Sequence, residues 1–109
     1  NRDSYNVSKV KQLLEEEYMK DISLTEISDR LGIHPNYLST LFKTETGTTY
    51  SQYLRALRVK KAADLMRTTN LKVYEIAERV GYSDTASFYR VFKEELGVSP
   101  ARYKRNLPD

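Results

Sequence analysis

The apolar residues of this chain recur three or four positions apart, a spacing that places them on one face of an α-helix. It predicts an amphipathic first helix over roughly residues 7–19, with Met19 at its end, and a long helix over roughly residues 51–67. Pro100 suits the first turn of a short last helix. Alternation of apolar and polar residues never persists over four positions between turn signals, so no strand is expected and the fold class is all-α.

The chain contains an internal repeat with a period of about 50 residues. The segment 24–33, LTEISDRLGI, is matched by 73–82, VYEIAERVGY, and residues 41–43, LFK, are matched by 91–93, VFK. Further matched pairs are Gly47 with Gly97 and Tyr53 with Tyr103. Two copies are too few for a solenoid, which needs at least three, so we interpret them as a duplicated supersecondary unit.

Each copy has the signals of a helix, a tight turn and a second helix. In the first copy, Ser23 and Glu26 form a capping-box pattern, and Gly32 stands where a left-handed residue would end the helix. Pro35 suits the first turn of the following helix. In the second copy, Asp84 is the expected N-cap of the second helix.

The spacing is more specific than that of an ordinary αα-hairpin, which is the alternative. A helix-turn-helix needs a small residue where its helices cross, here Ser28 and Ala77, and a turn glycine four residues later, here Gly32 and Gly81. The apolar residues expected to lock the helices together are Ile27, Leu31, Ile33, Leu38 and Leu41 in the first copy and Ile76, Val80, Tyr82, Phe88 and Val91 in the second. Two matches in register favour a pair of helix-turn-helix units.

Seven helices are therefore expected, in two subdomains and a connecting segment. The predicted boundaries are residues 7–48 for the first helix-turn-helix subdomain, 49–68 for the connecting helix and 69–107 for the second subdomain. Phe42 and Phe92 should be core residues. Nine tyrosines could suggest a stacking platform for single strands, but most occupy core-facing or repeat-matched positions. Those expected to be half-buried are Tyr37, Tyr50, Tyr53, Tyr82 and Tyr103.

The outward faces of the two second helices carry polar and basic residues at matching positions of the repeat. Major-groove edges suit these types, since a guanidinium pairs with guanine, an amide with adenine, and a methyl group contacts thymine. The candidate base contacts are Asn36, Ser39, Thr40, Thr85, Ala86, Tyr89 and Arg90, and the candidate phosphate contacts are His34, Lys43 and Lys93. His34 could also cap its helix. The alternative to a DNA contact is a solvated polar face.

Composition narrows the function classes. Cysteine is absent, which removes disulfides and thiolate zinc sites. His34 is the only histidine and no carboxylate cluster accompanies it, so no metal site is expected. The four glycines lie apart, so there is no phosphate-binding loop, and no cofactor is predicted. No nucleophile motif is present, and we expect a binding protein and not an enzyme.

Net charge and the start of the chain bear on the partner, the cellular location and the length of the parent protein. The net charge of +3 mildly favours a polyanionic partner, and the basic residues between positions 55 and 72 fit either such a partner or a solvated helix face. No apolar run could span a membrane, and no signal peptide pattern opens the chain. A cytoplasmic location is expected. The chain starts at Asn1 with no initiator methionine, so we expect a fragment of a longer protein.

The motifs resemble the DNA-binding domain of the AraC family of bacterial transcription regulators. The matching segments are residues 37–47 for the first recognition helix, 53–55 and 58–66 for the connecting helix, 75–82 and 88–93 for the second unit, and 97–100 for the closing turn. The resemblance covers roughly residues 7–105. The opening segment 7–18 is similar to the start of such domains fused behind response-regulator receivers.

This resemblance implies a seven-helix domain that places two recognition helices in successive major grooves of double-stranded DNA. It also implies a separate N-terminal sensing or receiver domain and RNA polymerase as a further partner. The chain departs from the family where His34 replaces a common serine and where Lys72 occupies the second unit's cap position. Because Ser39 and Thr40 supply no arginine, the second unit is expected to dominate base readout.

A different function class is an all-helical protein-interaction module that does not bind DNA. Such a module would present an exposed apolar stripe, whereas the outward stripes here are polar and basic. An enzyme would need a deep cleft, for which a chain of 109 residues leaves little room.

Overall fold

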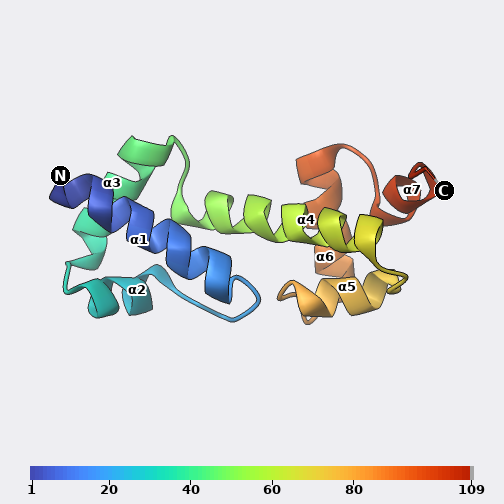
Figure 1. Ribbon diagram of the computed structural model, residues 1–109, viewed down its shortest axis with the longest axis horizontal. Helices are drawn as coiled ribbons and strands as arrows, with labels where there is room; N and C mark the ends of the chain where they lie inside the picture. The colour runs from blue at the N-terminus through green and yellow to red at the C-terminus, as the bar shows by residue number, and fades with distance from the viewer. Residues whose placement is uncertain (109) are drawn as a thin grey trace. The chain divides into compact units, whose positions relative to one another are not determined.

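The computed structural model describes residues 1–108, which form seven α-helices without a strand in that range (Figure 1). The helices are α1 (Arg2–Glu17), α2 (Leu24–Leu31), α3 (Pro35–Thr46), α4 (Tyr50–Thr68), α5 (Val73–Arg79), α6 (Thr85–Leu96) and α7 (Pro100–Arg105). The all-α prediction is confirmed. The chain forms two compact units, Asn1–Leu54 and a second that begins at Arg55, so α4 contributes residues to both.

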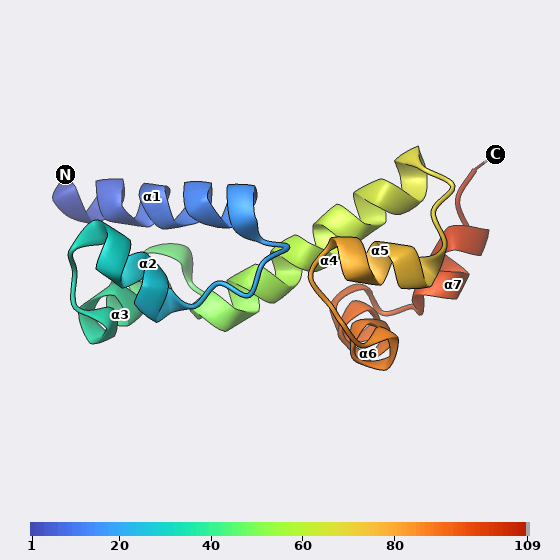
Figure 2. The same ribbon diagram turned by 90° about the horizontal axis from the view of Figure 1, so that it is seen from below.

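In the first unit, α1 lies alongside α2 and α3, and α2 packs against α3 (Figures 1 and 2). Its buried apolar residues are Val7, Val10, Leu14, Ile22, Ile27, Leu38, Leu41 and Phe42. The boundaries predicted for α1 were wrong at both ends. The helix starts at Arg2 because the Asn1 side chain accepts the Asp3 N–H at 2.8 Å and caps it. It ends at Glu17, so Met19 lies beyond it and is 40% exposed.

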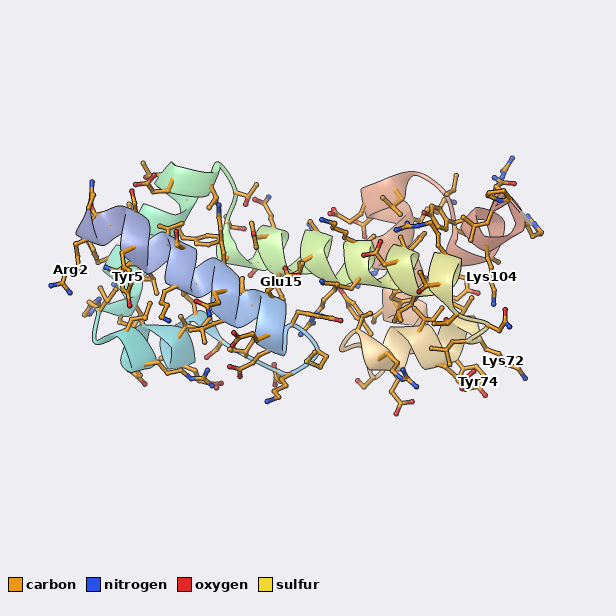
Figure 3. All side chains as sticks on the ribbon, viewed as in Figure 1. Arg2, Tyr5, Glu15, Lys72, Tyr74 and Lys104 are labelled. Atoms are coloured by element: carbon orange, nitrogen blue, oxygen red, sulfur yellow. The ribbon has the colours of Figure 1, made fainter. Side chains whose placement is uncertain are left out.

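In the second unit, α5 packs against α6, and α6 packs against α7. Its buried apolar residues are Val59, Ala62, Ala63, Met66, Ile76, Ala77, Val80, Phe88, Val91 and Phe92. At the start of α5, Lys72 occupies the N-cap position without a side-chain cap. Its N–H instead donates to the Glu75 carboxylate at 2.9 Å, while the side chains of Lys72 and Tyr74 point outward (Figure 3). Glu75 therefore stabilises the start of a helix whose cap residue cannot.

Equivalent aromatic clusters confirm that the repeat is structural. The Phe42 ring meets Tyr53 edge-on, with centroids 5.2 Å apart and planes at 85°. Phe92 meets Tyr103 in the same way, at 5.5 Å and 76°. Edge-to-face contacts of this kind stabilise a core by more than the burial of apolar surface area alone. Each unit therefore fastens its second helix to a tyrosine at the same position of the repeat.

The tyrosine predictions hold at four positions and fail at Tyr37. Tyr50, Tyr53, Tyr82 and Tyr103 are half-buried. Tyr37 is 50% exposed, because Leu38, Leu41 and Phe42 already fill the inward face of α3. Its hydroxyl donates to the Asp3 carboxylate at 2.8 Å, and this hydrogen bond raises the pKa of Tyr37. Tyr37 therefore links the start of α1 to α3 instead of filling the core.

The two helix-turn-helix turns share one hydrogen-bond pattern. Gly32 and Gly81 have φ angles of 69° and 107°, in the region that favours glycine. Beside them, the Ile33 N–H donates to the Ser28 carbonyl at 3.0 Å, and the Tyr82 N–H donates to the Ala77 carbonyl at 2.9 Å. Ser28 and Ala77 are both buried, as the helix-crossing role predicts.

Alanine substitution should distinguish these two glycines. A Cβ at Gly32 would meet no atom within 4 Å, so Gly32→Ala should cost only the strain of a positive φ, about 1 kcal/mol. A Cβ at Gly81 would lie 3.0 Å from the Arg58 guanidinium carbon, so Gly81→Ala should cost more because Arg58 must also move. Urea unfolding of both variants measures the difference. Equal losses would show that Arg58 yields freely.

Candidate nucleic-acid interface

The first candidate recognition helix, α3, begins with a histidine cap. His34 precedes the helix, and its Nδ1 accepts the Asn36 N–H at 3.1 Å, while Pro35 occupies the first turn, where no N–H is needed. The capping role expected of His34 is therefore confirmed. His34 is also exposed, so its predicted phosphate contact stays a prediction.

The second candidate recognition helix, α6, begins with a charged cap. The Asp84 carboxylate accepts the Ser87 hydroxyl at 2.7 Å and the Ala86 N–H at 3.0 Å. These bonds, the hydroxyl first, lower the pKa of Asp84. The cap predicted at this position is confirmed. It places a carboxylate at the start of α6, whereas the cap at the start of α3 is an imidazole.

The outward face of α3 carries the four predicted residues together. Asn36, Ser39, Thr40 and Lys43 are exposed, opposite the buried face of the same helix. Their spacing of three or four residues aligns them along one side of the helix. This face offers an amide and two hydroxyls for hydrogen bonding, followed by a single cation in the last turn.

The outward face of α6 is less uniformly open. Ala86, Arg90 and Lys93 are exposed, whereas Thr85 and Tyr89 are half-buried at its edges. The Arg90 guanidinium is not isolated, since its Nη1 donates to the Glu94 carboxylate at 3.3 Å. Glu94 was absent from the predicted site, although its place one helical turn after Arg90 is visible in the sequence.

Both recognition helices end in the same geometry. Gly47 and Gly97 have φ angles of 82° and 80°, and their N–H groups donate to the carbonyls of Lys43 and Lys93 at 2.8 Å. The two lysine side chains are exposed in the last helical turn, where the helix dipole favours a cation. The structure thus gives Lys43 and Lys93 equivalent places in the two units.

The arginines of the basic cluster between positions 55 and 72 make contacts within the second unit. Arg55 lies 3.8 Å from the Glu95 carboxylate, which links α4 to α6. The Arg58 guanidinium lies over the Tyr82 ring, 5.4 Å from its centroid. Burial is the main reason that the pKa of Tyr82 is raised, and Arg58 partly opposes that shift. These two arginines therefore support the scaffold that carries α6.

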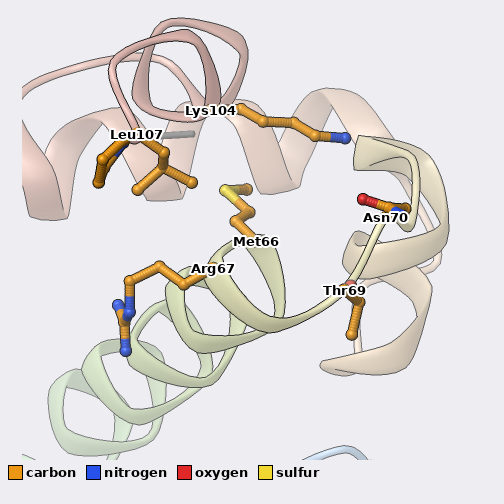
Figure 4. Close-up of a pocket in the computed structure, with 7 residues that line it drawn as sticks. Met66, Arg67, Thr69, Asn70, Lys104 and Leu107 are labelled. Carbon is orange, nitrogen blue, oxygen red and sulfur yellow. The ribbon is translucent and has the colours of Figure 1, made fainter.

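A separate hollow of about 410 Å³ lies between the end of α4 and α7 (Figure 4). Its lining residues are Met66, Arg67, Thr69, Asn70, Lys104, Leu107 and Pro108. Arg67 contacts Asp64 and the Tyr103 hydroxyl, and Lys104 Nζ donates to the Leu71 carbonyl at 2.9 Å. The charged groups around this hollow thus link α7 to α4 and to the loop after α4.

Within residues 1–108, no three side chains of the metal-binding types are grouped closely enough to hold an ion. No helix in this part of the chain is sufficiently long and apolar to cross a bilayer.

Comparison with known proteins relates this geometry to DNA binding. Residues 27–106 match a family described as a helix-turn-helix domain. The whole chain is similar to the solved C-terminal domain of AraT, a response regulator from Geobacillus stearothermophilus, with 35% identity, 91% of that chain covered and a TM-score of 0.93. Over 91% of its length it is similar to the DNA-binding domain of AdpA, a global transcriptional factor solved with a target DNA, at 25% identity, with 89% of that chain covered and a TM-score of 0.85.

Curated relatives are longer than this chain. It is 34% identical over 93 residues, 85% of its length, to YtdP of Bacillus subtilis, an uncharacterised helix-turn-helix-type transcriptional regulator. The chain spans 12% of YtdP, and 32% and 36% of two other such relatives. In these three relatives the similarity therefore concerns one part of a longer protein.

Proposed function

The chain belongs to the AraC family of helix-turn-helix DNA-binding domains from transcription regulators, and on that premise we propose that it binds specific double-stranded DNA sequences through α3 and α6. The observation that carries this proposal is the matched pair of exposed polar stripes, each set on the second helix of a helix-turn-helix frame. The second helix of such a frame enters the major groove with its early residues on base edges.

Each stripe supports a division of labour along its helix. Asn36, Ser39 and Thr40 on α3, and Thr85, Ala86, Tyr89 and Arg90 on α6, are the proposed base contacts. His34, Lys43 and Lys93 are the proposed phosphate contacts, which fix the position of the domain without reading sequence. Two helices that read successive major grooves would select two base-pair blocks whose centres are about 10 base pairs apart.

Selection from a random duplex pool at fixed salt tests this function. Repeated gel-shift selection and sequencing should enrich a bipartite motif, and binding should weaken steeply as salt is raised. The rival function, a protein-interaction module, would leave the retained DNA as random as the starting pool. Enrichment of a single block would keep DNA binding but remove one of the two recognition helices from the proposal.

The longer setting of this domain is also proposed. Three of its relatives, YtdP among them, extend well beyond the matched region, and the AraT domain is the C-terminal part of a response regulator. These facts support a parent regulator with an N-terminal sensing or receiver domain, located in the bacterial cytoplasm with its DNA. Regulation of transcription by such a protein would make RNA polymerase a further partner.

The two lysines lead to a matched prediction. Lys43→Ala and Lys93→Ala should weaken binding to all duplex sequences alike, because a phosphate contact carries no base information. Each should also reduce the slope of log affinity against log salt by about one. Fluorescence anisotropy at four salt concentrations, on selected and random duplexes, measures both effects. A changed base preference with an intact salt slope would make that lysine a base-reading residue.

A further inference from the structure

The two recognition helices differ at one charged pair. On α6, Arg90 Nη1 donates to Glu94 Oε1 at 3.3 Å, across one helical turn. The repeat-equivalent residues on α3 are Thr40 and Thr44, which form no such pair. The two units share the hydrogen-bond pattern of their turns and the contact of a buried phenylalanine with a repeat-matched tyrosine, but their caps differ and this charged pair is present on α6 alone of the two recognition helices.

Stability does not account for the pair. The side chains of Arg90 and Glu94 are 65% and 52% exposed. Water screens a pair of this kind, and an arginine that precedes its carboxylate partner is the weaker order on a helix. The pair therefore contributes little to folding, and it lies on the face proposed to meet DNA.

A carboxylate at position 94 should weaken DNA binding through that face unless it remains paired with Arg90. A free carboxylate facing the phosphates would be repelled, whereas a carboxylate held against a guanidinium is compensated. Only Nη1 of Arg90 donates to Glu94, so Nη2 and the remaining N–H groups stay available for a second partner. Guanine O6 and N7 need two such donors in a fixed fork.

We propose that Glu94 is a positioning residue that sets the base specificity of Arg90. It holds the guanidinium along the outward face of α6, with the free edge toward the base pairs, and it opposes the movement of Arg90 to a neighbouring phosphate. The proposal rests on the proposed function, because it assumes that α6 reads the major groove. It predicts that Glu94 raises specificity by reducing the affinity for random DNA.

Glu94→Gln tests this role, since it keeps the size of the side chain and removes its charge. Binding to random duplex should tighten a few-fold, and its salt slope should steepen by about one as Arg90 turns to a phosphate. The ratio of the affinity for the selected site to the affinity for random duplex should fall about fivefold, because the preference at one base pair of the site is lost. A residue with a purely structural role would change neither the salt slope nor the identity of one preferred base. Equal tightening on selected and random DNA would overturn the proposal.

Glu45→Gln is the matched charge control. Glu45 is exposed in the last turn of α3, so this variant changes the net charge by the same amount on the other recognition helix. It should tighten binding to all duplexes slightly, with every base preference intact. If Glu45→Gln reduced base preference as much as Glu94→Gln, a general charge effect would replace the positioning role.

Transfer of the pair to α3 provides a gain-of-function test. Thr40→Arg alone should raise the affinity for random DNA, whereas Thr40→Arg with Thr44→Glu should add a preference for guanine in the block read by α3. Equal preference in both variants would show that the carboxylate does not position the arginine. If the wild-type chain selects no sequence, the proposed function fails and this inference fails with it. If the wild type selects a site that Glu94→Gln also prefers to the same degree, only this inference fails.

Discussion

Phe92→Ala is expected to destabilise the second unit by about 3–5 kcal/mol. Phe92 is fully buried, and its ring centroid lies 5.6 Å from that of Phe88 and 5.5 Å from that of Tyr103. Truncation would remove a ring contact between α6 and α7 and would leave a cavity that these neighbours cannot close without moving. Urea unfolding followed by far-ultraviolet circular dichroism measures the loss.

The control for this variant is Leu96→Ala, one turn further along α6. Leu96 is 43% exposed, so its truncation creates no closed cavity and should cost well under the Phe92 value. Phe42→Ala should act on the first unit as Phe92→Ala acts on the second, since Phe42 is also fully buried and meets Tyr53. Wild-type stability in Phe92→Ala would contradict the packing described for the second unit.

The elements that the sequence predicts well are those governed by near neighbours. Ser23 and Asp84 cap their helices through bonds to residues two or three positions ahead. Gly32 ends α2 through its own φ angle, with no need of a distant partner. The core position of Phe42 follows from helical periodicity and from its match in the repeat. The caps and the turn glycine depend on residues within one helical turn, and the core position of Phe42 depends on a pattern visible along the chain, so none of them needed knowledge of a distant contact.

The misses have a different origin. The first turn of α1 has little apolar periodicity, and its start depends on the Asn1 cap, so a pattern of apolar residues placed the helix too late. Tyr37 finds its partner, Asp3, 34 positions away in the chain, and no local spacing indicates that contact. Glu94 is a different case. Its i,i+4 relation to Arg90 is a local signal, but Glu94 is not one of the outward stripe residues on which the predicted site was based.

Loss of the Arg90 side chain is expected to change which sequence the domain prefers. Arg90 is the single arginine among the outward stripe residues of α3 and α6. It lies between Phe88 and Phe92, whose buried rings occupy the core, so its side chain is directed away from the core. Arg90→Ala should weaken binding to the selected site by about 1–3 kcal/mol and binding to random DNA by much less. Site selection with wild type and variant at the same salt should show one base pair, a guanine in the wild-type motif, losing its preference.

Arg90→Lys separates base reading from charge. Lysine keeps the positive charge but lacks the planar fork that matches guanine O6 and N7, so affinity for random DNA should be retained while the preference at that base pair is lost. Lys93→Ala, on the same helix, is the control for a phosphate contact and should leave the motif unchanged. If Arg90→Ala gave the wild-type motif with uniformly weaker binding, Arg90 would be a phosphate contact. Arg90 donates to Glu94 in the free protein, and two measurements report what it contacts on DNA. The selected motif reports whether the guanidinium reads a base. The slope of log affinity against log salt reports whether it contacts a phosphate.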